Sequence, residues 1–147
     1  MKDMNAYRKL LFLGLSLSSW AQAAILTGEI HDADTGKMVP ARLYLQSEKG
    51  SWHHATSQGG TAIPYQVQRG QSIEVHTTLS AAPFEAKLPP GTYTLTAERG
   101  KEYHPAKQTV TIGEESVTVV LTLKRWTTTT LASRGWYSGD THVHRPV

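Results

Sequence analysis

Cysteine is absent from the 147 residues of this chain, so no disulfide can stabilise its fold. A chain of this length can fold without disulfides only if its hydrophobic core is large enough. The length itself suggests one domain, with little room for a second. The chain also lacks a cluster of Lys and Arg with interleaved aromatic residues. We therefore expect no nucleic-acid partner.

Long hydrophobic runs are missing as well. The one apolar run, residues 10–17, is too short to span a bilayer. It follows three basic residues and precedes Ala21-Gln22-Ala23, the small-x-small pattern of a cleavage site. We expect a signal peptide over residues 1–23 and a periplasmic or secreted product with no membrane anchor after cleavage. An amphipathic first helix of a cytosolic protein is the less favoured alternative.

The high isoelectric point belongs mainly to this leader. Residues 1–23 hold three of the fifteen Lys and Arg and one of the twelve Asp and Glu. The remaining 124 residues then carry twelve basic and eleven acidic side chains, a formal charge of +1. The overall charge therefore says little about partners.

Helical periodicity is also lacking, because no stretch after the leader repeats apolar residues every 3.6 positions. Alternation with a period of two is common instead. The predicted strands cover residues 25–30, 39–45, 72–78, 84–88, 92–98, 108–112 and 117–123. Short strands at this spacing predict an all-β fold, an antiparallel Ig-like or transthyretin-like sandwich of about seven strands.

Two details of the prediction concern connections. Residues 108–112 and 117–123 are expected to form a hairpin around Gly113-Glu114-Glu115. Residues 47–71, rich in Ser, Gly, Gln and His, are expected to form a long irregular excursion with one possible strand at residues 63–67.

The turns carry a family resemblance. Gly28-Glu29-Ile30, Asp34-Thr35-Gly36-Lys37 and Val39-Pro40-Ala41, followed later by Leu88-Pro89-Pro90-Gly91-Thr92-Tyr93, resemble the turns of carboxypeptidase regulatory-like and transthyretin-like domains. The resemblance implies an accessory β-sandwich over residues 24–125, with Tyr93 turned into the core. Such a domain usually stands beside a catalytic or adhesive unit.

A D-x-H-x-H pattern lies near the end of the sequence. On a strand, Asp140, His142 and His144 share one face, because alternate residues point the same way. Two imidazoles can then bind one ion, with the aspartate as a further ligand or as a group that orients a ligand. A bare H-x-H is a weak signal, and a solvated strand with two histidines is the simpler alternative.

The surrounding residues Gly135-Trp136-Tyr137-Ser138-Gly139 strengthen the metal interpretation. With the D-x-H-x-H pattern they resemble the entry motif of PHP (polymerase and histidinol phosphatase) hydrolases, in particular the exported CehA/McbA-type branch. The resemblance implies that His142 and His144 are metal ligands on a first barrel strand, with Asp140 beside them. It also implies two or three zinc, manganese or iron ions that activate water against ester, amide or phosphoester bonds of a small-molecule substrate.

No further ligands of such a barrel follow Val147. We therefore expect residues 126–147 to be a linker and the first strand of a truncated PHP-like domain, a stub of a missing barrel with an exposed Trp136. The chain would be the amino-terminal part of a longer hydrolase. By itself we expect it to be inactive, without catalytic residues and without a tightly bound metal. The alternative is a free-standing exported β-sandwich that serves in binding or adhesion.

Other polar and aromatic residues have simpler explanations. The histidines at positions 53, 54, 76 and 104 are interpreted as scattered surface residues rather than a second metal site. Trp52, Tyr65, Tyr103 and Trp126 form either a sugar-binding platform or, as we favour, caps on the ends of the core. Asp32 and Asp34 are assigned to a turn rather than to calcium.

Overall fold

The computed structural model describes residues 23–127 and 131–135, and these residues form strands and one short 3-10 helix. The strands are β1 (Ala24–Asp32), β2 (Ala41–Ser47), β3 (Trp52–His53), β4 (Thr56–Ser57), β5 (Ala62–Arg69), β6 (Ser72–Leu79), β7 (Phe84–Leu88), β8 (Gly91–Glu98), β9 (Tyr103–His104), β10 (Ala106–Ile112) and β11 (Val117–Arg125). The 3-10 helix, η1, spans Leu131–Arg134. The predicted leader lies outside the described residues. Among the described residues, no helix is long and apolar enough to cross a bilayer.

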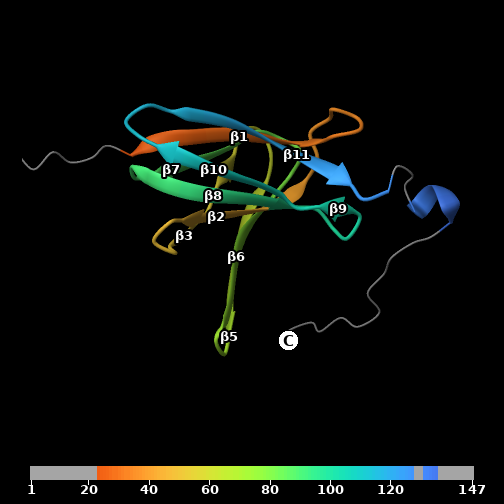
Figure 1. The fold of residues 1–147 in the computed structure, drawn as a ribbon, viewed down its shortest axis with the longest axis horizontal. Helices are drawn as coiled ribbons and strands as arrows, with labels where there is room; N and C mark the ends of the chain where they lie inside the picture. Colours follow the sequence, from red (N-terminus) through yellow and green to blue (C-terminus); the bar gives the residue numbers. More distant parts are fainter. Residues whose placement is uncertain (1–22, 128–130, 136–147) are drawn as a thin grey trace, which may run out of the picture.

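The strands form two sheets that pack face to face (Figure 1). The first sheet has the order β4-β7-β1-β11-β9, and the second has the order β10-β8-β2-β6-β5, with β3 also paired to β2. This arrangement confirms the predicted all-β sandwich. One pairing departs from the antiparallel rule, because β1 and β11 run parallel. The predicted barrel stub lies outside the described residues.

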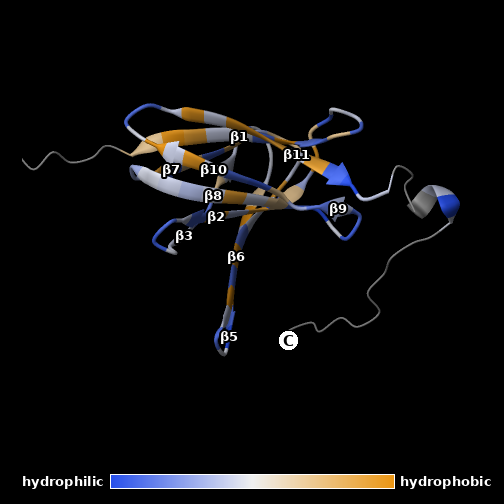
Figure 2. Ribbon diagram, viewed as in Figure 1, coloured by the Kyte–Doolittle hydropathy of each residue, from blue (hydrophilic) through white to orange (hydrophobic). Residues whose placement is uncertain are grey.

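Alternating burial explains why these segments are strands. In β1, β8 and β11, inward-facing residues are buried and their neighbours are half-buried or exposed. The inward residues form one core between the sheets, and Figure 2 shows the apolar positions along the strands. The core is centred on Leu26, Leu43, Phe84, Leu95 and Leu123, each at most 1% exposed. Tyr93 is also buried, as the family resemblance implied.

The predicted hairpin around Gly113 is wrong. β10 pairs with β8 in the second sheet, whereas β11 pairs with β1 and β9 in the first. The connection between them therefore crosses from one sheet to the other. The same holds for the turn at Pro89 and Pro90, which joins β7 of the first sheet to β8 of the second. A period of two shows which residues face the core, but a hairpin and a crossing between facing sheets have the same alternation.

The expected irregular excursion over residues 47–71 is wrong in part, although the possible strand at residues 63–67 is confirmed within β5. It contains β3, β4 and β5, and β5 pairs with β6 along eight residues. Only the last three residues of β6 pair with β2, and these are Thr77, Thr78 and Leu79. The rest of the β5–β6 hairpin projects from the sandwich (Figure 1). We call this hairpin, residues 62–79, the arm.

One glycine marks the tightest approach between strands of the first sheet. A Cβ atom at Gly28 would lie 2.5 Å from Cζ of Phe84 and 2.7 Å from Cγ2 of Val119. Both neighbours are buried, so neither can move into solvent. The glycine lets the Phe84 ring lie against the backbone of β1, and this close contact accounts for the glycine in the middle of a strand.

We expect Gly28→Ala to lower the free energy of unfolding by about 1–3 kcal/mol, because overpacking displaces Phe84. Chemical denaturation of the two proteins measures the difference. Gly113→Ala is the matched control, since an added Cβ there meets nothing within 4 Å. Equal stability of Gly28→Ala and the parent would contradict the tight contact.

Candidate functional site

The predicted metal ligands Asp140, His142 and His144 lie outside the described residues, as does Trp136. The metal site and the exposure of Trp136 therefore stay predictions. Within residues 23–127 and 131–135, no group of three or more His, Cys, Asp or Glu side chains lies close enough together to hold a metal ion.

A buried carboxylate organises the end of the sandwich from which the chain leaves. Asp32, the last residue of β1, is 2% exposed. Its Oδ2 accepts a 2.6 Å hydrogen bond from the Tyr103 hydroxyl and lies 3.5 Å from Nε of Arg125. Its Oδ1 accepts hydrogen bonds from the backbone N–H groups of Asp34 and Thr35. The predicted turn is thus present. The sequence pattern did not indicate that residues of β9 and β11 would also bind the Asp32 carboxylate.

Arg125, Glu102 and Trp126 complete this network. We call it the exit clamp (Asp32, Glu102, Tyr103, Arg125 and Trp126). The Arg125 guanidinium lies 4.4 Å from the centre of the Tyr103 ring, and its Nη1 donates a 2.7 Å hydrogen bond to Glu102. Trp126 donates its backbone N–H to Glu102 O at 3.1 Å and its indole Nε1–H to Lys101 O at 2.8 Å. The indole is nevertheless 54% exposed. The clamp therefore fixes the direction in which the chain leaves β11.

The clamp holds Asp32 in its ionised form. The Tyr103 hydrogen bond, helped by those from Thr35 and Asp34, lowers the pKa of Asp32 from 3.8 to about 2, against the opposing effect of burial. Because the folded pKa lies below the unfolded one, the stabilisation is present above about pH 4 and is lost as the pH falls toward 2.

Asp32→Asn should lower the free energy of unfolding by about 2 kcal/mol at neutral pH, since it removes a paired buried charge. The difference from the parent should shrink as the pH falls from about 4 to about 2. Denaturation at a series of pH values measures it. Asp34→Asn, which alters an exposed carboxylate of the same turn, is the control. A difference that does not change with pH would show that the carboxylate charge is not what stabilises the clamp.

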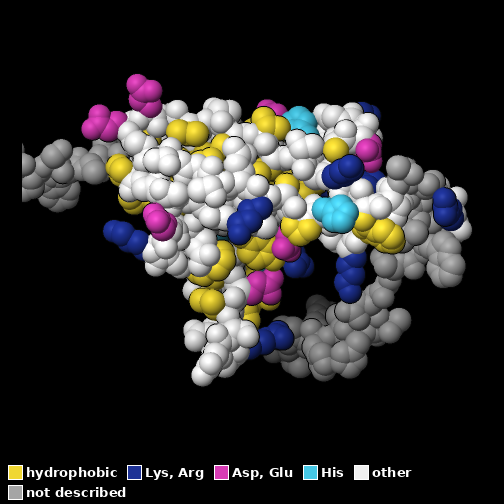
Figure 3. Space-filling model, viewed as in Figure 1, with side chains coloured by type: hydrophobic (Ala, Val, Ile, Leu, Met, Phe, Trp, Pro, Cys, Tyr) yellow, Lys and Arg dark blue, Asp and Glu magenta, His cyan; other side chains and the backbone are white. Residues whose placement is uncertain are grey.

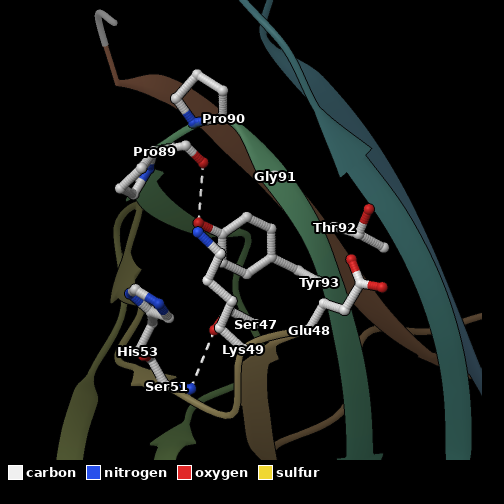
Figure 4. A pocket seen from close by; sticks show the side chains of 10 residues that line it. All are labelled: Ser47, Glu48, Lys49, Ser51, His53, Pro89, Pro90, Gly91, Thr92 and Tyr93. Atoms are coloured by element: carbon white, nitrogen blue, oxygen red, sulfur yellow. Dashed lines mark hydrogen bonds between the residues drawn. The ribbon is translucent and has the colours of Figure 1, made fainter.

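A hollow lies at the opposite end of the sandwich (Figure 4). It has a volume of about 250 Å³ and lies between the β2–β3 turn and the turn before β8. Tyr93 forms its floor and donates a hydrogen bond from its hydroxyl to Pro89 O at 2.8 Å. The His53 ring meets the Tyr93 ring edge-on, with centroids 5.4 Å apart, and burial lowers the pKa of His53. Lys49 and Glu48, also on its wall, are exposed.

The histidines weighed as a second metal site are spread over the molecule. His104 is exposed on β9, and His54 is exposed with its Nδ1 3.4 Å from the Thr77 hydroxyl. His76 differs from the expected surface position, because it is only 3% exposed. The four aromatic residues weighed as a sugar platform are likewise divided: Tyr103 and Trp126 belong to the exit clamp, Tyr65 lies on the arm and Trp52 lies in β3.

A row of rings crosses the outer face of the second sheet. Tyr65 of β5 stacks on His76 of β6 with centroids 4.8 Å apart and an interplanar angle of 24°, and Tyr44 of β2 lies 5.2 Å from His76 on the other side. Glu74 joins this row through Arg42 at 3.6 Å and the Tyr44 hydroxyl at 3.5 Å. The sequence pattern could not show the row, since its rings come from three strands that only the sheet order brings together.

The surroundings of His76 in this row lower its pKa. Its Nδ1 lies 3.3 Å from Glu74 Oε1 but has no hydrogen-bond partner among the described residues. Burial, and then the charge of Arg42, lower the pKa of His76, with a smaller lowering from His54, while Glu74 and Glu98 raise it. The net effect is a pKa below the ordinary 6.5.

We expect His76 to contribute a loss of stability as the pH drops below about 6.5, because the unfolded chain then binds a proton that folded His76 resists. His76→Phe keeps a ring between the two tyrosines but cannot titrate, so its stability should fall less steeply between about pH 6.5 and pH 5. Denaturation midpoints over this range measure the slope, and His104→Phe is the exposed control. An unchanged slope in His76→Phe would count against a lowered pKa of His76.

Comparisons with known proteins place the chain only by its general architecture. No family model matches it, and no curated protein matches it. Among solved structures it is similar to the pilus 2b backbone protein of group B streptococcus (15% identity, TM-score 0.48, 70% of this chain and 41% of that one). It is also similar to a minor pilin of Streptococcus agalactiae (21%, TM-score 0.48, 74% and 47%). A third is a DUF3823 family protein from Parabacteroides merdae (17%, TM-score 0.42, 72% and 48%).

Each of these matches spans less than half of the other chain. The likeness is one of β-sandwich architecture, at identities and TM-scores too low to support any statement about function. The function must be argued from the residues of this chain.

Proposed function

We propose that residues 24–125 are the accessory sandwich of an exported metal-dependent hydrolase of the PHP type. Residues 126–147 would contribute the linker and the first metal-binding strand. The observation that carries this proposal is the exit clamp. The clamp brings a buried carboxylate, a buried tyrosine and an arginine together at the end of β11, and residues 126–139 separate the end of β11 from the D-x-H-x-H pattern.

The clamp stabilises the end of the sandwich, and a fixed exit also gives a following domain a defined orientation. A flexible connection leaves two modules free to sample many relative orientations, whereas a rigid joint removes that freedom before the modules pack. Arg125 and Trp126 are both tied to the turn before β9, so the direction of the chain is set as far as Trp126. This supports a bracing role for the sandwich.

The donor set of the C-terminal segment suits a divalent transition metal. Two imidazoles with a nearby carboxylate are ligands that zinc, iron and manganese accept. His142 and His144 would hold the ion, with Asp140 as a ligand or an orienting group. A metal bound there supplies Lewis acidity and lowers the pKa of a bound water, the chemistry needed against ester, amide or phosphoester bonds.

The first test is the size and metal content of the native product. An antibody raised against residues 24–125 would purify it from the source cells, for mass measurement and elemental analysis. We expect a mass far above that of 124 residues, with bound zinc, manganese or iron. A double variant, His142→Ala with His144→Ala, should lose metal, whereas His104→Ala on β9 should keep it. A metal-free product with the mass of 124 residues would contradict the hydrolase proposal.

A second candidate function is a free-standing exported module for binding or adhesion. A specific observation favours it: the arm projects from the sandwich and exposes apolar side chains that the core does not use. Ile63 is 57% exposed, Ile73 is 47% exposed and Tyr65 is 38% exposed. The metal-free outcome of the same experiment would favour this candidate.

A further inference from the structure

The arm contains a small hollow on the outer face of the second sheet. It has a volume of about 170 Å³ and is lined by Tyr65, Val67, Arg69, Ser72, Ile73 and Glu74. Tyr65, Val67 and Arg69 alternate along β5 and therefore share a face, and Glu74 and Ser72 are their partners across the hairpin. Figure 3 shows hydrophobic, acidic and basic side chains close together on this part of the molecule.

One face of the Tyr65 ring is covered by other side chains of the sheet. His76 stacks on one side of Tyr65, and Tyr44 supports His76 in turn. His76 is buried although its Nδ1 has no hydrogen-bond partner among the described residues. Burying an unpaired polar atom costs free energy, and the stacking of the three rings offsets part of that cost. Tyr65 lies on β5, the last strand in the order of its sheet, so the side turned away from His76 has no neighbouring strand among the described residues. A ring fixed before binding loses little conformational entropy when a ligand stacks on it.

The polar groups around the ring indicate what kind of ligand fits. Arg69 supplies donors and the Glu74 carboxylate supplies acceptors, so the hollow offers both kinds of hydrogen bond and no net charge. Val67 and Tyr65 supply apolar surface. A pyranose ring matches this combination, because it carries an apolar face of C–H groups and an edge of hydroxyls that donate and accept.

The same observations disfavour a protein partner. Of the large exposed apolar side chains of the arm, Tyr65 and Ile73 line the hollow, whereas Ile63 does not. A stable protein interface buries about 1,200–2,000 Å² around a contiguous apolar centre. The hollow, in contrast, has room only for a ligand about as large as one sugar ring.

We propose that the arm binds a neutral carbohydrate, with one sugar ring against Tyr65 and its hydroxyls hydrogen-bonded to Arg69 and Glu74. This site goes beyond the hydrolase proposal and is compatible with either candidate function, because it lies wholly within the sandwich. In a hydrolase it would hold the protein near a polysaccharide, and in a free-standing module it would be the adhesive site itself.

The test measures binding of the full chain to cellulose, chitin and peptidoglycan by sedimentation, and to cellohexaose and chitohexaose by calorimetric titration. We expect saturable binding to at least one of these probes. Tyr65→Ala should weaken it about tenfold or more, because it removes the stacking surface, while Tyr65→Phe should stay within about threefold of the parent. Glu74→Gln should weaken binding without abolishing it.

Val120→Ala is the matched control, since it removes a 56% exposed apolar side chain from β11 in the other sheet. Far-ultraviolet circular dichroism establishes that each variant is folded, and Tyr65→Phe keeps the stacked row should Tyr65→Ala lose it. Absence of binding to every probe, or equal weakening by Tyr65→Ala and Val120→Ala, would overturn the proposal. So would capture of a protein by the arm that none of the sugars displaces. Neither result depends on metal binding by His142 and His144, so the two proposals fail separately.

Discussion

The carboxylate of Asp32 is the group on which the organisation of this sandwich depends. It is buried at the point where the first and last strands end side by side, and a buried charge is tolerated only when it is paired and hydrogen-bonded. Its partners come from the following turn, from β9 and from β11. One side chain thus ties together segments separated by 71 and more positions in the chain.

The parallel pairing of β1 with β11 also ends at Asp32. The two strands run in register from Leu26 opposite Val117 to Asp32 opposite Leu123, so they end together. The backbone N–H of Ala33 then donates to Leu123 O at 2.9 Å, which extends the pairing into the turn. The chain enters β11 by crossing from the second sheet, and the clamp at the end of β11 fixes it as far as Trp126.

The exit clamp and the arm, on which the two proposals rest, lie on different parts of this frame. The exit clamp is at the end of the first sheet, and the arm extends from the second sheet (Figure 1). A module built this way can hold a neighbouring domain at one place and a ligand at another. If both proposals hold, binding through the arm would raise the local concentration of substrate around the hydrolase, an effect that depends on the length and stiffness of the connection. A rigid exit favours that arrangement.

The amino-acid sequence by itself determined which residues face the core, because alternation with a period of two is a local property of each strand. It therefore predicted the all-β sandwich. The turn at Asp32 was predicted from its turn-forming residues, and the burial of Tyr93 was implied by the family resemblance. The sequence also placed Asp140, His142 and His144 on one face of a predicted strand, outside the described residues. Only the tertiary structure decided which strands pair. Pairing depends on contacts between distant segments, and a period of two is the same in a hairpin, in a crossing between sheets and in a parallel pair. The β10–β11 crossing, the partners of Asp32 and the row of Tyr44, His76 and Tyr65 could not be predicted for that reason.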